Sequence, residues 1–406
     1  MRVVMLTTSF PRWANDYFGI FVFRLARALS RRGVDVTVVA PHSSGLRDFE
    51  VMDQVKVFRF RYGPSFLERT YGTWYAHELR GVARKIESWL RLLSLPLYFI
   101  SAFLCTIIVC KISKKDVIFS HWAVPSGFIG SLCSAILRIP HVVKCYGGDV
   151  VVTTKKPFLG FIVKAVLKHS RFVLTNSLLT KKDVEKLGIQ GDKIRVTYEL
   201  IELNVPKNSI KETRCKLGIG DNEKFIFSLG RLVPYKGFEY LIRSMAFLDK
   251  NIILVIGGDG PLKEELQALA RKLKVSQRCR FVGAIPQEEL PNFYSACDIY
   301  VSSSIYDEEG NREGFAVTVA EAMGYGKPVV VTDEGAQIEL IKDGNNGLVA
   351  RAKDPQDLAS KILICAKHSH IARTIAFKAQ NDIAQHFSCE KITSLVMDAL
   401  NKACKS

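Results

Sequence analysis

Short apolar runs alternate with longer segments of helical periodicity along almost the whole chain. A strand of a parallel sheet reads as a continuous apolar run, because helices cover both faces of such a sheet. The alternation therefore predicts an α/β fold with parallel sheets. In the first half, the expected strands are residues 3–7, 35–40, 55–60, 117–120, 141–145, 172–176 and 194–197.

The same alternation returns in the second half, from residue 225 to residue 349. Between the halves, residues 198–208 lack periodicity and contain Pro206, so we interpret them as a linker. A chain of 406 residues is long enough for two cores of ordinary size. We therefore predict two domains, residues 1–200 and 201–385, and a separate terminal segment, residues 386–406, with a helix at 391–402.

Two carboxylates in the second half are separated by seven residues, Glu313 and Glu321. In a continuous helix they would lie within about 80° of each other and about 12 Å apart along the axis. Gly314 favours a loop at Glu313 and a helix over 315–323. The first N–H groups of this helix, at Phe315 and Ala316, would attract an anion, while the two acids accept hydrogen bonds from hydroxyl groups. A sugar nucleotide has this layout, and the alternative is a pair of exposed helix acids.

Two glycine-containing turns precede this pair, each directly after an apolar strand. Residues 225–229 lead into Gly-Arg-Leu-Val-Pro-Tyr-Lys-Gly at 230–237, and residues 251–256 lead into Gly-Gly-Asp-Gly-Pro at 257–261. Ligands of parallel sheets bind outside the carboxyl ends of the strands, which is where the first turn would place Arg231 and Lys236. Two cations there could neutralise a diphosphate. Glycines such as Gly258 and Gly260 allow the backbone to approach a ligand closely.

In this order and spacing, the three motifs resemble the donor domain of retaining nucleotide-sugar glycosyltransferases of family 4. That family has the GT-B fold, in which two Rossmann-like domains with parallel sheets face a central cleft. In the resembled fold, the last helix crosses back to the N-terminal domain. The first half adds looser motifs, Ser-Phe-Pro-Arg at 9–12 with Gly19, and His-Trp at 121–122 with Pro125 and Gly127.

The resemblance implies a retaining hexosyltransferase that uses a UDP- or GDP-linked sugar. Arg231 and Lys236 would stabilise the departing diphosphate, Glu313 would bind a sugar hydroxyl group, and Glu321 would bind the ribose. The remaining donor contacts would come from Gly19, Gly258, Gly260, Phe315 and Ala316. Retention through a front-face mechanism needs no enzymic nucleophile, and a covalent role for Glu313 is the alternative.

Five residues of the first half would border the acceptor or line the cleft: Arg12, Asp16, His121, Tyr146 and Asp149. The alternative for His121 is a purely structural histidine. Many relatives have His-Gly-x-Asp where this chain has Tyr146-Gly-Gly-Asp149. A phenol has a pKa near 10 and rarely carries a proton at neutral pH, so this difference argues against a catalytic histidine at that position.

We expect neither a metal ion nor a cofactor. The sequence has no Asp-x-Asp pair of the kind that holds a divalent cation between phosphates, so cations and helix dipoles would take that role. The ten cysteines form no Cys-x-x-Cys pair, and several lie in apolar runs, as expected for free thiols in a reduced compartment. The chain shows no signal-peptide pattern after Met1. These features predict a cytoplasmic protein.

Positive charge is concentrated in the first half, where residues 1–200 carry a net charge of +16 against +1 for residues 201–406. The same half contains 19 uncharged residues, Leu92–Cys110, between basic clusters. Their length permits a transmembrane helix, but Pro96, three hydroxyl residues and the strand that begins soon afterwards favour a helix packed on the sheet or resting on a bilayer. We predict peripheral attachment to anionic lipid on the inner membrane face.

The expected partners are therefore a nucleotide-sugar donor, a lipid-linked or glycan acceptor and an anionic membrane surface. Nucleic acid is not expected, because the sequence contains none of the recognition motifs. Two other functions remain open on this fold. One is a nucleotide-sugar epimerase or a phosphorylase, and the other is a non-catalytic donor-binding subunit of a membrane assembly.

Overall fold

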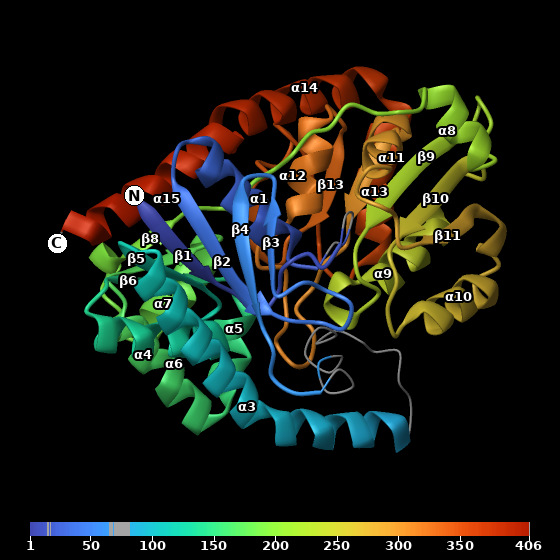
Figure 1. The fold of residues 1–406 in the computed structure, drawn as a ribbon. Coiled ribbons are helices and arrows are strands. Elements are labelled where there is room, and N and C mark those ends of the chain that lie inside the picture. The colour runs from blue at the N-terminus through green and yellow to red at the C-terminus, as the bar shows by residue number, and fades with distance from the viewer. Residues whose placement is uncertain (14–15, 17, 65–67, 69–81, 406) are drawn as a thin grey trace. The chain divides into compact units, whose positions relative to one another are not determined.

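The computed structural model describes residues 1–13, 16, 18–64, 68 and 82–405 of the chain. They form two compact units, one of residues 1–200 and 389–406 and the other of residues 201–388 (Figure 1). Each unit is an α/β layer structure around its own sheet, with cores made of the apolar runs that predicted the strands. The predicted fold class is confirmed.

In unit 1, eight strands of the described residues form one sheet, in the order β3-β4-β2-β1-β5-β6-β7-β8. All neighbouring pairs are parallel except β3 and β4. The strands are β1 Arg2–Leu6, β2 Asp35–Pro41, β3 Phe49–Met52, β4 Val55–Phe60, β5 Val117–His121, β6 His141–Cys145, β7 Phe172–Thr175 and β8 Ile194–Val196.

Alternate residues of β1 point to the two faces of this sheet. Val3 and Met5 share a core with α1 and α15, whereas Val4 and Leu6 share another with α3 and α4. The helices are α1 Ile20–Arg31, α3 Val82–Ile112, α4 Phe128–Leu137, α5 Gly148–Val151, α6 Pro157–His169, α7 Leu178–Lys186 and α15 Cys389–Lys405. The terminal helix thus belongs to unit 1, although the preceding helices belong to unit 2.

In unit 2, six described strands form an all-parallel sheet, in the order β11-β10-β9-β12-β13-β14. The strands are β9 Lys224–Leu229, β10 Ile252–Gly257, β11 Cys279–Gly283, β12 Ile299–Ser302, β13 Val329–Thr332 and β14 Leu348–Ala350. The helices are α8 Ile210–Lys216, α9 Phe238–Ser244, α10 Lys263–Lys272, α11 Leu290–Ala296, α12 Val317–Gly324, α13 Pro355–Lys367 and α14 Ser369–His386.

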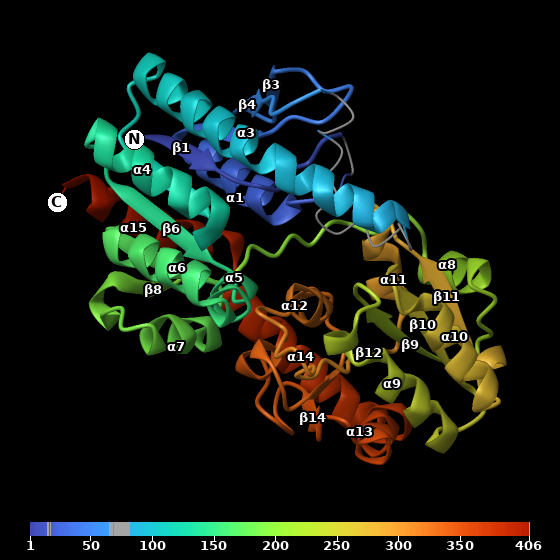
Figure 2. The same ribbon diagram turned by 90° about the horizontal axis from the view of Figure 1, so that it is seen from below.

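The uncharged segment Leu92–Cys110, predicted to be helical, lies within α3, and residues 65–67 and 69–81 lie outside the described residues. Figure 2 shows α3, α4 and α6 side by side in one layer on the unit 1 sheet. Ser94, Tyr98, Ala102 and Thr106 of α3 are buried at helical spacing. Over residues 95–112, the opposite side of the same helix carries exposed apolar side chains.

Candidate active site

The strand order of unit 2 reverses at β9, which lies between β10 and β12. Crevices form outside the carboxyl ends of strands at such a switch point. The Gly230 N–H donates to the Gly257 carbonyl at 3.1 Å, and the Leu232 N–H donates to the Asp259 carbonyl at 2.9 Å. The two glycine-containing turns therefore form one hydrogen-bonded structure at this edge.

Lys236 and Glu313 form an ion pair at the same edge, with both side chains largely buried. Burial lowers the pKa of Lys236, but the charge and hydrogen bond of Glu313 together with the Tyr235 hydroxyl more than offset this, so that the pKa is raised and the ammonium group stays charged. An Arg231 guanidinium N–H donates to the Tyr235 hydroxyl oxygen at 2.9 Å, and both cations lie near the Tyr235 ring. The structure thus brings together the three predicted catalytic residues of this unit, with Arg231 and Lys236 beside Tyr235 and Glu313 paired with Lys236.

Gly258 and Gly260 leave no space for a side chain. A Cβ at Gly258 would lie 1.9 Å from the Gly230 carbonyl oxygen, and one at Gly260 would lie 2.6 Å from that of Leu232. Gly258 also has a φ of +118°. Both glycines therefore serve first to fit one turn against the other.

The helix predicted over 315–323 begins later, at Val317, because the chain makes an inverse γ-turn first. Ala316 has φ −81° and ψ 73°, and the Val317 N–H donates to the Phe315 carbonyl at 2.9 Å. Phe315 and Ala316 thus lie in the turn before α12, not in its first helical turn. Glu321 lies within α12, buried, where it accepts a hydrogen bond from the Tyr294 hydroxyl at 2.9 Å.

The sheet of unit 1 has its own switch point, between β1 and β5. The loop after β1 is closed by Asp16, which pairs with Arg12 at 2.7 Å and accepts from the Phe18 N–H at 3.2 Å. Gly19 begins α1 with a φ of +69°, and a Cβ there would lie 2.3 Å from the Ser9 carbonyl oxygen. Three predicted residues therefore lie together on this loop.

His121, Tyr146 and Asp149 meet at the ends of β5 and β6. His121 was expected just beyond its strand, but it is the last residue of β5 and is fully buried. Its Nδ1 lies 2.5 Å from the Tyr146 hydroxyl oxygen. Asp149 accepts hydrogen bonds from the N–H groups of Ala123 and Tyr146, both at 2.9 Å, and thereby joins the segments that follow the two strands. Burial raises the pKa of Asp149 in spite of these hydrogen bonds.

Sequence reasoning missed a buried ion pair beneath this group. The Lys144 ammonium lies 3.0 Å from a Glu199 carboxylate oxygen and donates to the Tyr198 carbonyl at 2.8 Å, and both charged side chains are almost fully buried. Lysine is rarely buried without a partner, so a lysine inside the apolar strand 141–145 was the available signal. Its partner lies in the segment that we interpreted as a linker.

The predicted site residues therefore form two groups, one in each unit. In the part of the chain that the structure describes, no group of three histidine, cysteine or acidic residues is arranged to hold a metal ion. The group in unit 2 presents cationic side chains and the backbone of the two glycine-containing turns. The group in unit 1 presents aromatic and hydrogen-bonding side chains.

Two family models match nearly all of the chain between them. The family described as glycosyl transferases group 1 matches residues 209–380, and the glycosyl transferase 4-like domain matches residues 19–198. Together with the two α/β units, whose sheets are almost entirely parallel, these matches define the class of protein. The chain belongs to the glycosyltransferases with the GT-B fold, and its 4-like domain agrees with family 4.

Individual relatives agree with this family. An uncharacterised glycosyltransferase of Methanocaldococcus jannaschii is 26% identical, covering 97% of this chain and 96% of its own length. Alpha-monoglucosyldiacylglycerol synthase of Streptococcus pneumoniae is 25% identical over 72% of this chain and 68% of its own. The structure of Anabaena HepE in complex with UDP-glucose superimposes with a TM-score of 0.77 at 21% identity, covering 99% of this chain and all of that one.

Proposed function

We propose that this glycosyltransferase moves a hexose from a UDP- or GDP-linked donor to a lipid-linked or glycan acceptor, with retention of configuration and without a metal ion. The observation that carries the proposal is the cluster of Arg231, Lys236 and Glu313 at the switch point of unit 2. The relatives add support, since one is named for a glycolipid product and another structure holds UDP-glucose.

In this mechanism, catalysis is mainly electrostatic. Arg231 and Lys236 stabilise the negative charge that develops on the leaving diphosphate, and the burial of the Lys236 side chain strengthens its interaction. Glu313 binds a hydroxyl group of the donor sugar and keeps Lys236 charged beforehand. Glu321 binds the ribose, while Gly258, Gly260, Phe315 and Ala316 bring backbone near the donor, with Gly19 of unit 1 beside the diphosphate. The departing phosphate takes the proton of the acceptor hydroxyl, so no protein nucleophile is needed.

In this proposal, unit 1 holds the acceptor at a site formed by Arg12, Asp16, His121, Tyr146 and Asp149.

The outer surface of unit 1 suits an acceptor that is bound to a membrane. Within the described residues, one helical stretch, Ser94–Ile112, is long and apolar enough to span a membrane by length and composition, with a mean hydropathy of 2.1. One face of that stretch packs on the sheet, as in a helix that rests on a bilayer and does not cross it.

Three helices, α3, α4 and α6, lie in one layer (Figure 2), and we define the outer apolar surface by their exposed apolar side chains. It consists of Ile100, Leu104, Ile108 and Ile112 of α3, Leu132 and Ile136 of α4, and Phe158 and Phe161 of α6. Exposed lysines border it, including Lys111, Lys114, Lys156 and Lys164. Such a combination of large apolar side chains and cations suits an anionic bilayer.

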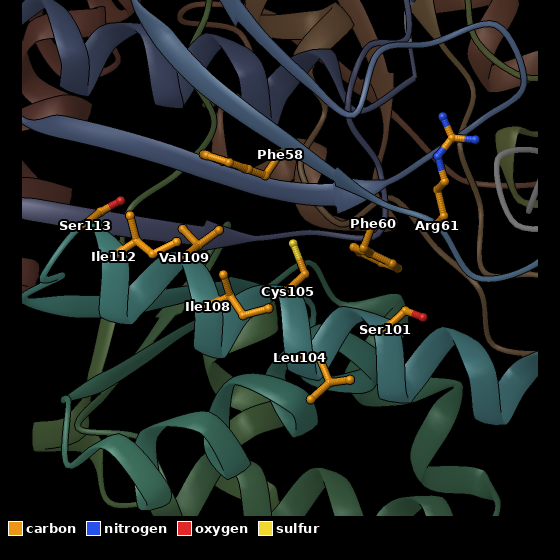
Figure 3. Close-up of a pocket in the computed structure, with 10 residues that line it drawn as sticks. All are labelled: Phe58, Phe60, Arg61, Ser101, Leu104, Cys105, Ile108, Val109, Ile112 and Ser113. Carbon is orange, nitrogen blue, oxygen red and sulfur yellow. The ribbon is translucent and has the colours of Figure 1, made fainter.

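A shallow apolar groove of about 340 Å³ extends this surface between α3 and β4 (Figure 3). Leu104, Ile108 and Ile112 belong to both the groove and the exposed side of α3. Phe58 and Phe60 line it from β4. The apolar surface therefore continues around the helix toward the edge of the sheet, which increases the area available to lipid.

The proposal is tested by mixing the full chain with UDP-glucose, UDP-galactose, UDP-N-acetylglucosamine and GDP-mannose, with and without a lipid extract. We expect one donor to raise the Tm and to be cleaved slowly, and the lipid extract to accelerate cleavage. Interconversion of the sugar without release of a nucleoside diphosphate would instead show an epimerase. Binding without any turnover, with or without the extract, would show a donor-binding subunit.

Activity is expected to survive excess EDTA, because Arg231 and Lys236 supply the positive charge that a divalent ion supplies in other transferases. The measurement is the rate of nucleoside diphosphate release before and after chelation, and after adding Mg²⁺ or Mn²⁺. Complete loss with EDTA and recovery with either metal would show that a cation neutralises the diphosphate.

Binding to phosphatidylglycerol vesicles is expected to weaken as salt rises from 0.1 to 1 M, because the Debye length falls from about 10 to 3 Å. In the double variant Ile108→Ser/Phe161→Ser, affinity should fall at least about tenfold, since each apolar side chain contributes about 1.5–3 kcal/mol when fully buried. Phe377→Ser is the matched control, because the exposure of Phe377 lies between those of Ile108 and Phe161 but Phe377 is on α14 of unit 2.

Co-sedimentation separates the outcomes. Release by detergent alone would mean that the Leu92–Cys110 segment inserts into the bilayer. Absence of binding at any salt concentration would contradict membrane attachment and point to a soluble acceptor.

A further inference from the structure

Tyr235 lies in the turn that carries Arg231 and Lys236, and it has no role in the mechanism described so far. An Arg231 N–H donates to the Tyr235 hydroxyl oxygen at 2.9 Å. The Lys236 ammonium lies 5.7 Å from the centre of the Tyr235 ring, and the Arg231 guanidinium lies 6.0 Å from it, within the range of cation–π attraction. Both cations assigned to the diphosphate are therefore neighbours of one aromatic side chain.

The backbone of this turn is fixed to the segment that follows β12. The Ile305 N–H donates to the Tyr235 carbonyl at 2.8 Å, and the Ser303 hydroxyl donates to the Lys236 carbonyl at 3.1 Å. Gly237 ends the turn with a φ of +62°, and a Cβ there would collide with the Ser303 carbonyl oxygen. Tyr235 therefore projects from a backbone that is held in place before any ligand binds, as a preorganised site requires.

The Tyr235 hydroxyl has one donor and two acceptor positions. Its oxygen accepts the Arg231 N–H, so its own O–H must point elsewhere. Within the part of the chain that the structure describes, this O–H donates to no protein acceptor. The two cations also favour an orientation in which the oxygen faces them and the hydrogen points away. The hydroxyl is therefore a donor that is available to a ligand at this edge of the unit 2 sheet.

The charge around Tyr235 favours an anionic ligand. Arg231 and Lys236 carry two positive charges, and Glu313, which pairs with Lys236, carries one negative charge, so the three groups sum to +1. A phosphate group presents several strong acceptor oxygens, so it can accept from the Tyr235 O–H and from both cations at the same time. A hydrogen bond to such a charged acceptor is stronger than one between neutral groups.

We propose that Tyr235 is a further binding residue for the donor diphosphate. Its O–H donates to a phosphate oxygen, while its oxygen holds the Arg231 guanidinium in position. This contact rests on the proposed transferase function, because it belongs to the same donor site of unit 2. Tyr235 recognises the phosphates alone, so its hydroxyl contributes to the binding of a nucleoside diphosphate and not to the binding of a nucleoside.

The test is calorimetric titration of the full chain with UDP and GDP, followed by competition with uridine or guanosine, which lack the phosphates. Tyr235→Phe keeps the ring and removes the hydroxyl, so the Kd of the diphosphate that the wild type binds should rise about tenfold, as expected for a lost hydrogen bond to a charged group. The Kd of the matching nucleoside should stay the same. Tyr325→Phe is the matched control, because it removes a hydroxyl that lies just after α12 and donates to the Asn204 carbonyl at 2.7 Å.

The Arg231→Ala background separates a direct phosphate contact from an effect that is transmitted through the guanidinium. In that background, Tyr235→Phe should still raise the Kd of the diphosphate at least about threefold, because the O–H contacts the phosphate itself. No further loss in that background would overturn the direct contact. An unchanged Kd in Tyr235→Phe alone, or an equal loss for the nucleoside, would overturn it as well. A wild type that binds neither UDP nor GDP would instead contradict the proposed function.

Discussion

Replacement of Lys236 by alanine is expected to lower kcat at least a hundredfold while the fold is kept. Lys236 is a buried cation whose charge is secured by Glu313 at the switch point of unit 2. Removal of one preorganised group that stabilises transition-state charge costs about 2.7–4 kcal/mol, or roughly two to three orders of magnitude in rate. The measurement is the initial rate of nucleoside diphosphate release at saturating donor, with circular dichroism to verify folding.

Arg231→Ala is expected to behave in the same way, because its guanidinium lies at the same edge and is held by the Tyr235 hydroxyl. Lys367→Ala is the matched control, since Lys367 forms only an exposed ion pair with Asp249 on the surface of unit 2. Near-normal kcat in both Lys236→Ala and Arg231→Ala would show that the donor diphosphate binds elsewhere.

Replacement of Lys144 by methionine is expected to lower the free energy of unfolding by about 3–5 kcal/mol, because it leaves the Glu199 carboxylate buried without its cation. Burial already raises the pKa of Glu199, and Lys144 opposes that effect. Without Lys144, the pKa of Glu199 in the folded state rises further above its value in the unfolded chain. The folded variant therefore binds more protons than the unfolded chain, so its stability must fall as pH rises.

The loss of unfolding free energy in Lys144→Met should accordingly be larger at pH 8 than at pH 5. The measurement is urea denaturation of the wild type and the variant at each pH. Lys144→Met/Glu199→Leu should recover much of the stability, because no buried charge remains. Lys186→Met, which changes an exposed lysine paired with Asp183, should alter stability by no more than about 0.5 kcal/mol. Equal losses at both pH values would show that the charge of Glu199 is not the cause.

Most strands were predictable from the sequence because both faces of a parallel sheet are buried, which makes each strand a continuous apolar run. The exception in unit 1 is β3, Phe49–Met52, at the edge of the sheet. Its exposed Phe49 and Val51 alternate with half-buried residues, so its four positions lack the apolar run. An edge strand of this length is specified by its pairing with β4 and has little local signal.

The candidate site was predictable where function depends on short motifs that follow a strand. Arg231 and Lys236 lie at the carboxyl end of β9 for this reason. The late start of α12 was not predictable, because the γ-turn at Ala316 has no characteristic residue type. Partners distant in sequence were missed as well. Tyr294 lies 27 residues from Glu321, and Glu199 lies 55 residues from Lys144, so only the fold brings them together.

The central claim is transfer from a nucleotide sugar with retention of configuration, and the anomeric configuration of the product tests it. The direct measurement is proton NMR of the sugar that the full chain transfers from its α-linked donor to acceptor, with Lys236→Ala as the blank. We predict an α-linked product that forms with the wild type and is nearly absent with the variant. A β-linked product would contradict retention, and a product that forms equally fast with Lys236→Ala would contradict the donor site in unit 2.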